Sequence, residues 1–283
     1  IGVCVAVLMA AQAAAVPLDL ADVVGGGNGF GTGTEDTGID PRTGDIIPDV
    51  VSESNNQDGA GNSYSPNIYN SVSESANPYV DGVFVPDGGA SSTPVSSTGL
   101  MAEFPDTDGK SWDNAIGYNP NYSGNTSWRN PGNLLVNGTE TAMFEAPNTG
   151  IGFHSNKGIT FDLQAMGSDI GLAPSRYTAR VGVRVGTEDD GDLDHYVLLD
   201  GEVAWKRLNL ERGDDSVFLD IDIPSDTRFL TLAGTAGADQ NYAYDHGIIG
   251  NPTVTFTPEP ATLCLLGIAA VGLVGVEAKR RRN

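Results

Sequence analysis

Residues 177–185 read YTARVGVRV, and this stretch alternates between two kinds of side chain. The first set is apolar and consists of Tyr177, Ala179, Val181, Val183 and Val185, with Thr178, Arg180, Gly182 and Arg184 between them. Successive side chains of a β-strand point to opposite faces of the sheet. The alternation therefore predicts an antiparallel strand with one face buried and the other exposed.

Segments on both sides of this stretch predict further strands. Residues 193–199 and 202–205 flank Asp200-Gly201, a dipeptide typical of a tight β-hairpin turn, and Asp81-Gly82 within residues 78–86 predicts a second hairpin. Further predicted strands are 18–24, 159–163, 217–223, 228–233 and 253–256. The body of the chain shows no clear amphipathic helix. Many short strands separated by turns and long loops predict an all-β fold, a β-sandwich of the jelly-roll type.

The charge balance excludes one class of partner. The 283 residues carry 15 Lys and Arg against 37 Asp and Glu, which gives a formal net charge of −22. So acidic a surface repels phosphate backbones, and we expect no nucleic-acid partner. The two cysteines, Cys4 and Cys264, lie near the ends of the sequence, which leaves the body without disulfides, cysteine metal sites or a thiol nucleophile.

Both ends of the sequence carry features of an exported protein. Residues 1–15 are apolar and end in small residues, which is typical of the apolar region and cleavage zone of a secretory signal. We expect the sequence to begin inside that signal. Residues 258–283 contain Pro258-Glu259-Pro260, an apolar run at 261–276 and a basic cluster at 279–282. The run predicts a helix about 24 Å long that could enter a membrane, with the basic cluster on the cytoplasmic side. An ordinary single-pass anchor is one interpretation.

This tail resembles the PEP-CTERM sorting signal. The triplet, the apolar run and the terminal arginines stand in the order of that signal, with Glu277 as a small departure. The resemblance implies secretion and recognition by an exosortase in a Gram-negative, exopolysaccharide-producing bacterium. It also implies export to the cell surface or the extracellular matrix, with membrane anchoring through the C-terminal helix before processing.

The body, residues 16–257, divides into a loop-rich part at 16–149 and a strand-rich part at 150–257. The second part contains ITFDLQA (159–165), VGVRVG (181–186), LLDGEVAW (198–205), DSVFLDIDI (215–223), RFLTLAG (228–234) and YDHGIIGNP (244–252). These segments resemble the NPCBM domain, a carbohydrate-binding module of the galactose-binding-like jelly-roll class. The resemblance implies that fold. The family usually has Trp three residues after the His of the last segment, where this chain has Ile249.

The stretch at 239–246, DQNYAYDH, is the candidate sugar site. A sugar needs an aromatic ring against its apolar face and polar groups for its hydroxyls. We therefore select Tyr242, Asp245 and His246, supported by Asn241 and Asp239, with Trp205 as a further aromatic candidate. In the alternative interpretation, Asp245 and His246 hold the loop by hydrogen bonds and Tyr244 plugs the end of the sandwich.

The stretch at 187–194, TEDDGDLD, is the densest acidic segment of the chain. Closely spaced carboxylates suit Ca²⁺, the cofactor that Asp189, Asp190, Asp192 and Asp194 would bind, although the spacing is not that of an EF-hand. A solvated hairpin loop is the alternative. His195 follows Leu193 by two residues and shares its face of the predicted strand, so we expect a buried histidine.

These features predict a non-enzymatic surface protein whose sandwich binds a glycan, with the producer's exopolysaccharide as the candidate ligand. A structural surface protein without a glycan site is the first alternative. A glycan-active enzyme is the second and has the least support, because the sequence contains no HExxH or GxSxG motif and nothing singles out a pair of catalytic carboxylates.

Overall fold

The computed structural model describes residues 14–50, 62–63, 67–86, 89, 92–107, 110–111, 115–120, 132–185, 191–242 and 244–258. Most of the predicted secretory signal, residues 1–13, and the predicted C-terminal helix at 261–276 lie outside these residues. Within the described part of the chain, no helix is both long and apolar enough to cross a bilayer.

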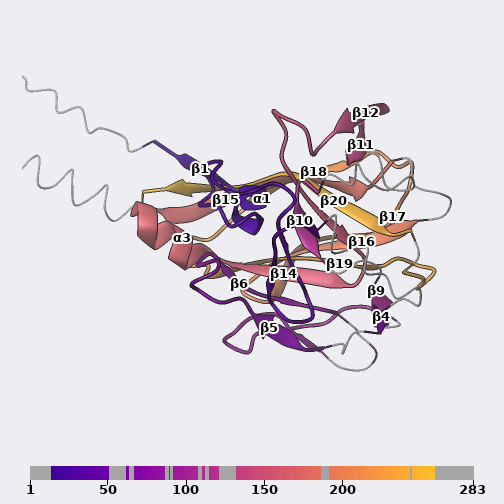
Figure 1. Ribbon diagram of the computed structural model, residues 1–283, viewed down its shortest axis with the longest axis horizontal. Helices are drawn as coiled ribbons and strands as arrows, with labels where there is room; N and C mark the ends of the chain where they lie inside the picture. The colour runs from indigo at the N-terminus through magenta and orange to yellow at the C-terminus, as the bar shows by residue number, and fades with distance from the viewer. Residues whose placement is uncertain are drawn as a thin grey trace, which may run out of the picture.

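Two antiparallel sheets form the body of the protein (Figure 1). The first sheet runs in the order β18 (Val217–Asp222), β15 (Ala173–Val183), β20 (His246–Thr257), β13 (Gly150–His154), β10 (Ile116–Tyr118), β2 (Gly38–Ile39) and β3 (Ile46–Ile47), and β1 (Val16–Asp19) also pairs with β20. The second sheet runs in the order β17 (Glu202–Glu211), β16 (Asp192–Leu199), β19 (Phe229–Ala236), β14 (Lys157–Asp162), β6 (Val80–Phe84) and β5 (Tyr69–Ser71).

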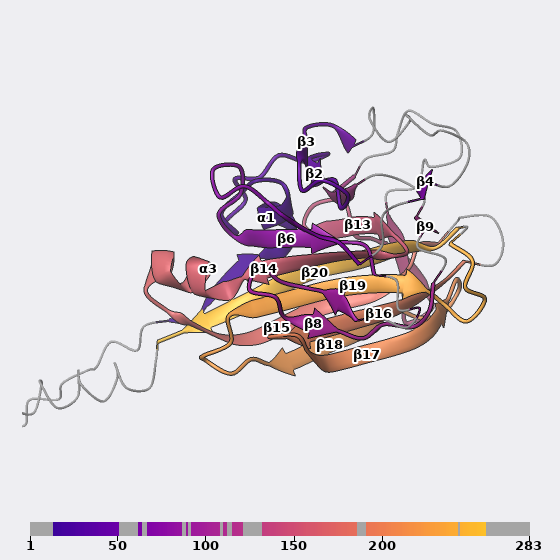
Figure 2. The same ribbon diagram turned by 90° about the horizontal axis from the view of Figure 1, so that it is seen from below.

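Three small ribbons complete the strands. They are β4 (Asn62–Ser63) with β9 (Lys110–Ser111), β7 (Thr93–Pro94) with β8 (Met101–Ala102), and β11 (Asn133–Val136) with β12 (Thr139–Ala142). Figure 2 shows β8 near β19 and β16, with the small strands β2 and β3 on the opposite side of the view. Strands from before residue 150 therefore enter both main sheets, through β1, β10, β2 and β3 in one and β6 and β5 in the other.

The main core lies between the two sheets. Tyr177 and Val181 of β15 belong to the same buried cluster as Val197 of β16 and Leu230 of β19. Burying these apolar faces against each other is the main favourable contribution to folding. The apolar positions of residues 177–183 are buried as their alternation predicts, and the predicted all-β sandwich is confirmed.

One of the two predicted hairpins is correct and the other is wrong. Asp200 and Gly201 join β16 to β17 and have φ values of 48° and 85°, as the tight hairpin turn requires. Asp81 and Gly82, by contrast, lie in the middle of the single strand β6. A Cβ atom on Gly82 would stand 2.5 Å from the ring of Tyr69, so this glycine makes room for a neighbouring side chain and not for a turn.

Two short helices depart from the predictions. The strand predicted at 18–24 ends at Asp19, whose carboxylate accepts a hydrogen bond from the Ala21 N–H and caps α1 (Leu20–Val24). The strand predicted at 159–163 likewise ends at Asp162, which caps α3 (Leu163–Ile170). The expectation that the body lacks helices is therefore wrong, because an eight-residue helix spans too few turns to show its period in sequence.

The glycine-rich stretch at 25–33 folds around one buried carboxylate. Asp22 Oδ2 accepts a hydrogen bond from the Gly29 N–H at 2.6 Å, and Asp22 Oδ1 accepts one from the Gly33 N–H at 2.5 Å. A Cβ atom on Gly27 would stand 2.2 Å from Asp22 Oδ2. The glycines therefore let the backbone close on a side chain of the protein itself.

The sandwich has two ends of different character. Three connections, β15–β16, β17–β18 and β19–β20, lie at the end where β20 begins with His246, and we call this the loop end. The opposite end of β20, where Val16 of β1 pairs with Phe256, is the tail end. Figure 1 places α3 and β1 on the same side of the molecule, at the tail end.

Candidate functional site

A cavity of about 740 Å³ opens at the loop end. It is lined by Val185, Gly191, Asp192, Glu211, Arg212, Gly213 and Asp239, which come from all three connections of that end. The strand register explains why these residues meet, since Asp192 of β16 pairs with Glu211 of β17. The cavity volume lies within the range of small-molecule binding sites, roughly 300 to 1,000 Å³.

Two glycines allow the connections to approach each other closely. A Cβ atom on Gly191 would stand 2.4 Å from the carbonyl oxygen of Tyr244, and one on Gly237 would stand 2.3 Å from the carboxylate of Asp192. The Arg212 N–H also donates to the carbonyl of Gly191 at 2.9 Å. The predicted acidic stretch and the predicted sugar stretch, some fifty residues apart, are thus joined in one site.

Asp192 is the central acid of the cavity. It is only 7% exposed, and its Oδ2 accepts a hydrogen bond from the Ala238 N–H at 2.9 Å. No hydrogen-bond donor among the described residues reaches its Oδ1. Burial and the nearby charge of Asp239 raise the pKa of Asp192 to about 6. Asp239 itself is exposed, and its Oδ1 accepts from the Asn241 N–H at 2.7 Å.

Asp245 and His246 are buried behind the cavity wall. Asp245 is completely buried, and its Oδ1 accepts from the Asp192 N–H at 3.2 Å, while no described donor reaches its Oδ2. Burial raises the pKa of Asp245 to about 8, and the charges of Asp192 and Asp239 act in the same direction. Burial lowers the pKa of His246 well below its usual value. The alternative in which these two residues hold the loop therefore fits their positions.

His246 belongs to a buried basic cluster. Its ring stands edge-on to His154 with 4.6 Å between the ring centroids, and Lys157 and Arg184 are also buried nearby. Desolvation is the largest cause of the lowered pKa of His154, and the three basic neighbours lower it further. Both histidines therefore stay neutral near pH 7 and support the loop end from within.

The aromatic candidates separate into three cases. Tyr242 is half-buried, whereas Tyr244 is 47% exposed and has a φ of 70°. Tyr244 therefore does not plug the end of the sandwich. Trp205 lies in the middle of β17 opposite Val197 and packs against the main core. Counted along the strand from Asp192, Val197 is about 16 Å away, so Trp205 does not belong to this site.

The structure describes two of the four predicted calcium ligands, Asp192 and Asp194. Asp189 and Asp190 lie outside the described residues. Asp194 is a buried part of β16, and its oxygens accept from the Asn209 N–H at 2.6 Å and the Thr235 hydroxyl at 3.3 Å. Within the described part of the chain, no group of three His, Cys, Asp or Glu residues is placed to hold a metal ion. The predicted burial of His195 is confirmed, and burial lowers its pKa to about 4.

Sequence reasoning missed the contribution of the β17–β18 connection. Glu211, Arg212 and Gly213 line the cavity, although no local motif marks them. Only the strand pairing of β16 with β17 brings them to Asp192. Counting outward from the predicted turn at Asp200-Gly201 places residue 209 opposite Asp192, and two irregularities in the pairing, which the sequence does not mark, move the partner to Glu211.

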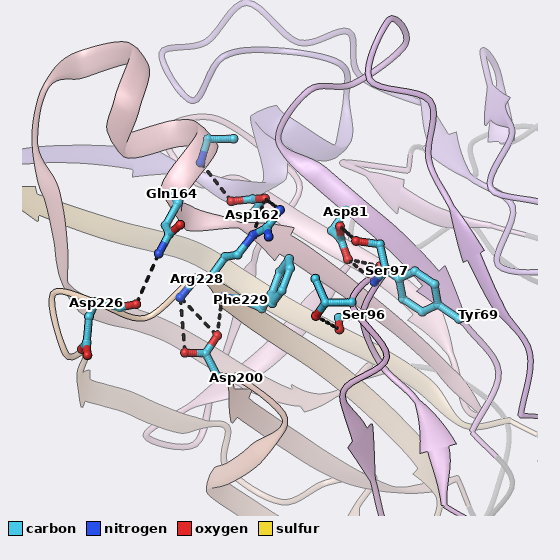
Figure 3. Close-up of polar contacts among 12 residues, drawn as sticks. Tyr69, Asp81, Ser96, Ser97, Asp162, Gln164, Asp200, Asp226, Arg228 and Phe229 are labelled. Atoms are coloured by element: carbon cyan, nitrogen blue, oxygen red, sulfur yellow. Dashed lines mark hydrogen bonds and ion pairs between the residues drawn. The ribbon is translucent and has the colours of Figure 1, made fainter.

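A second polar cluster lies on the second sheet, near the tail end (Figure 3). Asp81 accepts from the Tyr69 hydroxyl and from both the N–H and the hydroxyl of Ser97. Arg228 donates to Asp162, and its backbone N–H donates to Asp200. Each of these three carboxylates has donors for both oxygens. The cluster therefore fixes loops onto the sheet and offers no unsatisfied group to a ligand.

Several solved structures are similar to this chain. A CBM51 module of Clostridium perfringens, solved with methyl-galactose, shares 23% identity over 43% of this chain and 78% of its own, with a TM-score of 0.36. Tandem CBM51 modules of a family 98 glycoside hydrolase from Streptococcus pneumoniae share 20% identity over 51% of this chain and 41% of their own, with a TM-score of 0.40. This chain thus spans about two fifths of that second structure.

Two family models match the sequence, whereas no curated protein does. The PEP-CTERM protein-sorting motif matches residues 256–282, as the C-terminal triplet, apolar run and arginines predicted. The model of the NPCBM/NEW2 domain matches residues 108–255, a range that begins before the strand-rich part and includes every residue of the cavity. Because this match covers more than half of the sequence, the chain belongs to the NPCBM/NEW2 domain family.

Proposed function

We propose that this is an exported protein whose β-sandwich is a non-catalytic carbohydrate-binding module. Membership of the NPCBM/NEW2 family supports carbohydrate binding, and the PEP-CTERM motif supports export and processing by an exosortase. The producer's own exopolysaccharide is the ligand that fits both, because a sorted surface protein meets this polymer first.

The observation that carries the proposal is the exposed Tyr244 beside a polar cavity. An exposed tyrosine is a surface for the apolar face of a sugar ring, and the carboxylates of Asp192 and Asp239 can accept hydrogen bonds from sugar hydroxyls. The positive φ of Tyr244 is uncommon for a bulky residue, and such conformations concentrate at functional sites.

Retention of the full-length chain on immobilised polysaccharides tests this proposal. We expect Tyr244→Ala and Asp239→Ala each to reduce retention at least tenfold. The first removes the aromatic surface for the sugar ring, and the second removes an acceptor for the sugar hydroxyls. Phe30→Ala is the matched control, since Phe30 is an equally exposed aromatic on the glycine-rich loop at the tail end. If the folded protein is retained on no glycan, including exopolysaccharide of a producing strain, the protein is a structural surface protein.

The same assay decides the role of calcium. The calcium prediction names Asp189, Asp190, Asp192 and Asp194, and the assay tests it with and without the ion. Retention that is lost in chelator and restored by calcium would assign the ion to this stretch. Equal retention with and without chelator would leave residues 187–194 as a solvated acidic connection.

A further inference from the structure

The cavity contains an acid pair that lacks a donor. The carboxylates of Asp192 and Asp239 lie within hydrogen-bonding reach of each other, yet both are acceptors when ionised. Asp192 is more than nine-tenths buried and lines the cavity, and no donor in the described part of the chain reaches its Oδ1. Behind it, Asp245 Oδ2 is a second buried oxygen without a described donor.

Among the described residues that line the cavity, acidic groups outnumber basic ones. Burial and the charge of Asp239 keep the pKa of Asp192 raised, even though Arg212 lines the same cavity. Glu211 adds a third acidic group to the lining, so the cavity walls carry three carboxylates against one guanidinium. A site of this kind favours a cationic ligand group, and burial strengthens the attraction.

The cavity residues that the structure describes suit an organic ammonium better than a metal ion. Calcium needs six to eight oxygen ligands around it, and the described residues contain no group of three acidic or histidine side chains arranged for a metal. An ammonium group carries three N–H donors and is satisfied by two carboxylates and one further acceptor. The cavity volume of about 740 Å³ also exceeds what a single ion requires.

We propose that the cavity recognises a sugar carrying a free amino group, with the ammonium bound between Asp192 and Asp239. This inference rests on the proposed function, because it names the class of glycan that the same loop end would bind. A sugar whose nitrogen is acetylated has one amide donor and no charge, and it would leave the acid pair uncompensated.

Calorimetric titration of the full-length chain tests the inference with two trisaccharides, one of glucosamine and the other its fully N-acetylated counterpart. We expect the amino form to bind at least tenfold more tightly. Asp192→Asn and Asp239→Asn should each reduce this preference about tenfold or more, because each converts a charged acceptor into a neutral amide. Asp226→Asn is the charge-matched control, since Asp226 is exposed in the β18–β19 turn at the tail end.

Each other outcome has a definite meaning. Equal binding of both trisaccharides would overturn the amino-sugar inference while leaving glycan binding intact, and retention on no glycan at all would remove the proposed function as well. Equally tight binding of ethanolamine, or stoichiometric calcium binding that Asp239→Asn abolishes, would also overturn the inference. Because Asp239 is exposed, its variant stays informative even if Asp192→Asn fails to fold.

Discussion

At the scale of single residues, Asp245 combines complete burial with a raised pKa. Its carboxyl group keeps a proton in the folded protein up to about pH 8, whereas an unfolded aspartate loses it near pH 4. Since the folded state binds the extra proton, the free energy of unfolding falls as pH rises toward 8. The three buried histidines act with the opposite sign, but only below their unfolded pKa of about 6.5.

We therefore predict that the free energy of unfolding decreases by about 1–2 kcal/mol between pH 6.5 and pH 8. Asp245→Asn should abolish most of this decrease, because the amide keeps an acceptor for the Asp192 N–H and has no proton to lose. Denaturant unfolding at several pH values measures the effect. A wild-type protein whose stability does not change over this window would contradict the protonation of Asp245 in the folded state.

Some properties of the candidate-site residues can be predicted from the sequence, and others depend on the tertiary structure. The stretch around Asp239 is a candidate because aromatic and polar residues are adjacent there, and this cue needs no tertiary structure. Burial of Asp245 and His246 could not be read in the same way, because both residues are polar and follow an exposed loop. Asp192 was predicted as a loop ligand but begins β16, since a strand boundary depends on pairing with Glu211.

At the scale of elements, the glycine-rich loop depends on one side chain. Both oxygens of the buried Asp22 accept backbone N–H groups of this loop. We predict that Asp22→Ala destabilises the protein by about 2–4 kcal/mol, because the buried Gly29 N–H and the half-buried Gly33 N–H lose their acceptors at once. Asp22→Asn keeps one acceptor oxygen and should be milder. The midpoint of denaturant unfolding measures both variants.

Asp40→Ala is a useful comparison for this prediction. Asp40 accepts hydrogen bonds from the N–H and guanidinium of Arg42, in a neighbouring turn whose arginine is partly exposed. Its removal should cost less than that of Asp22, since water can replace a partly exposed partner. Equal effects of the two alanine variants would show that Asp22 does not organise the loop.

Some secondary-structure elements can be predicted from local sequence patterns, and others cannot. Strands β15 and β18 follow from alternation, and the β16–β17 hairpin follows from Asp200-Gly201. The same dipeptide type at Asp81-Gly82 misleads, because a glycine that accommodates Tyr69 looks identical to a turn glycine. Strands β2 and β3 contain two residues each and pair with each other, but β2 joins the sheet only through β10, which lies far along the chain. No local pattern can specify such pairings.

At the scale of the whole molecule, strand β20 separates the candidate site from the sorting motif. This strand begins at His246 behind the cavity and ends at Thr257, inside the matched PEP-CTERM range. Twelve residues of extended chain place its two ends about 36 Å apart. Strands from before residue 150 join both main sheets, so the described strands from β1 to β20 belong to one sandwich with the cavity and the sorting motif at opposite ends of β20.

This separation predicts how the protein can be tethered without loss of binding. Two variants can be coupled to a surface through a single cysteine. In both, Cys4 and Cys264 are replaced by serine; one variant carries Asp226→Cys at the tail end and the other carries Gln240→Cys at the loop end. Both positions are exposed. The form coupled through residue 226 should bind glycan as the free protein does, and the form coupled through residue 240 should lose most binding, because the surface then covers the cavity. Surface plasmon resonance compares the two at equal density. Equal binding by both forms would place the glycan site away from the loop end, and the free, uncoupled variants show whether either cysteine itself disturbs binding.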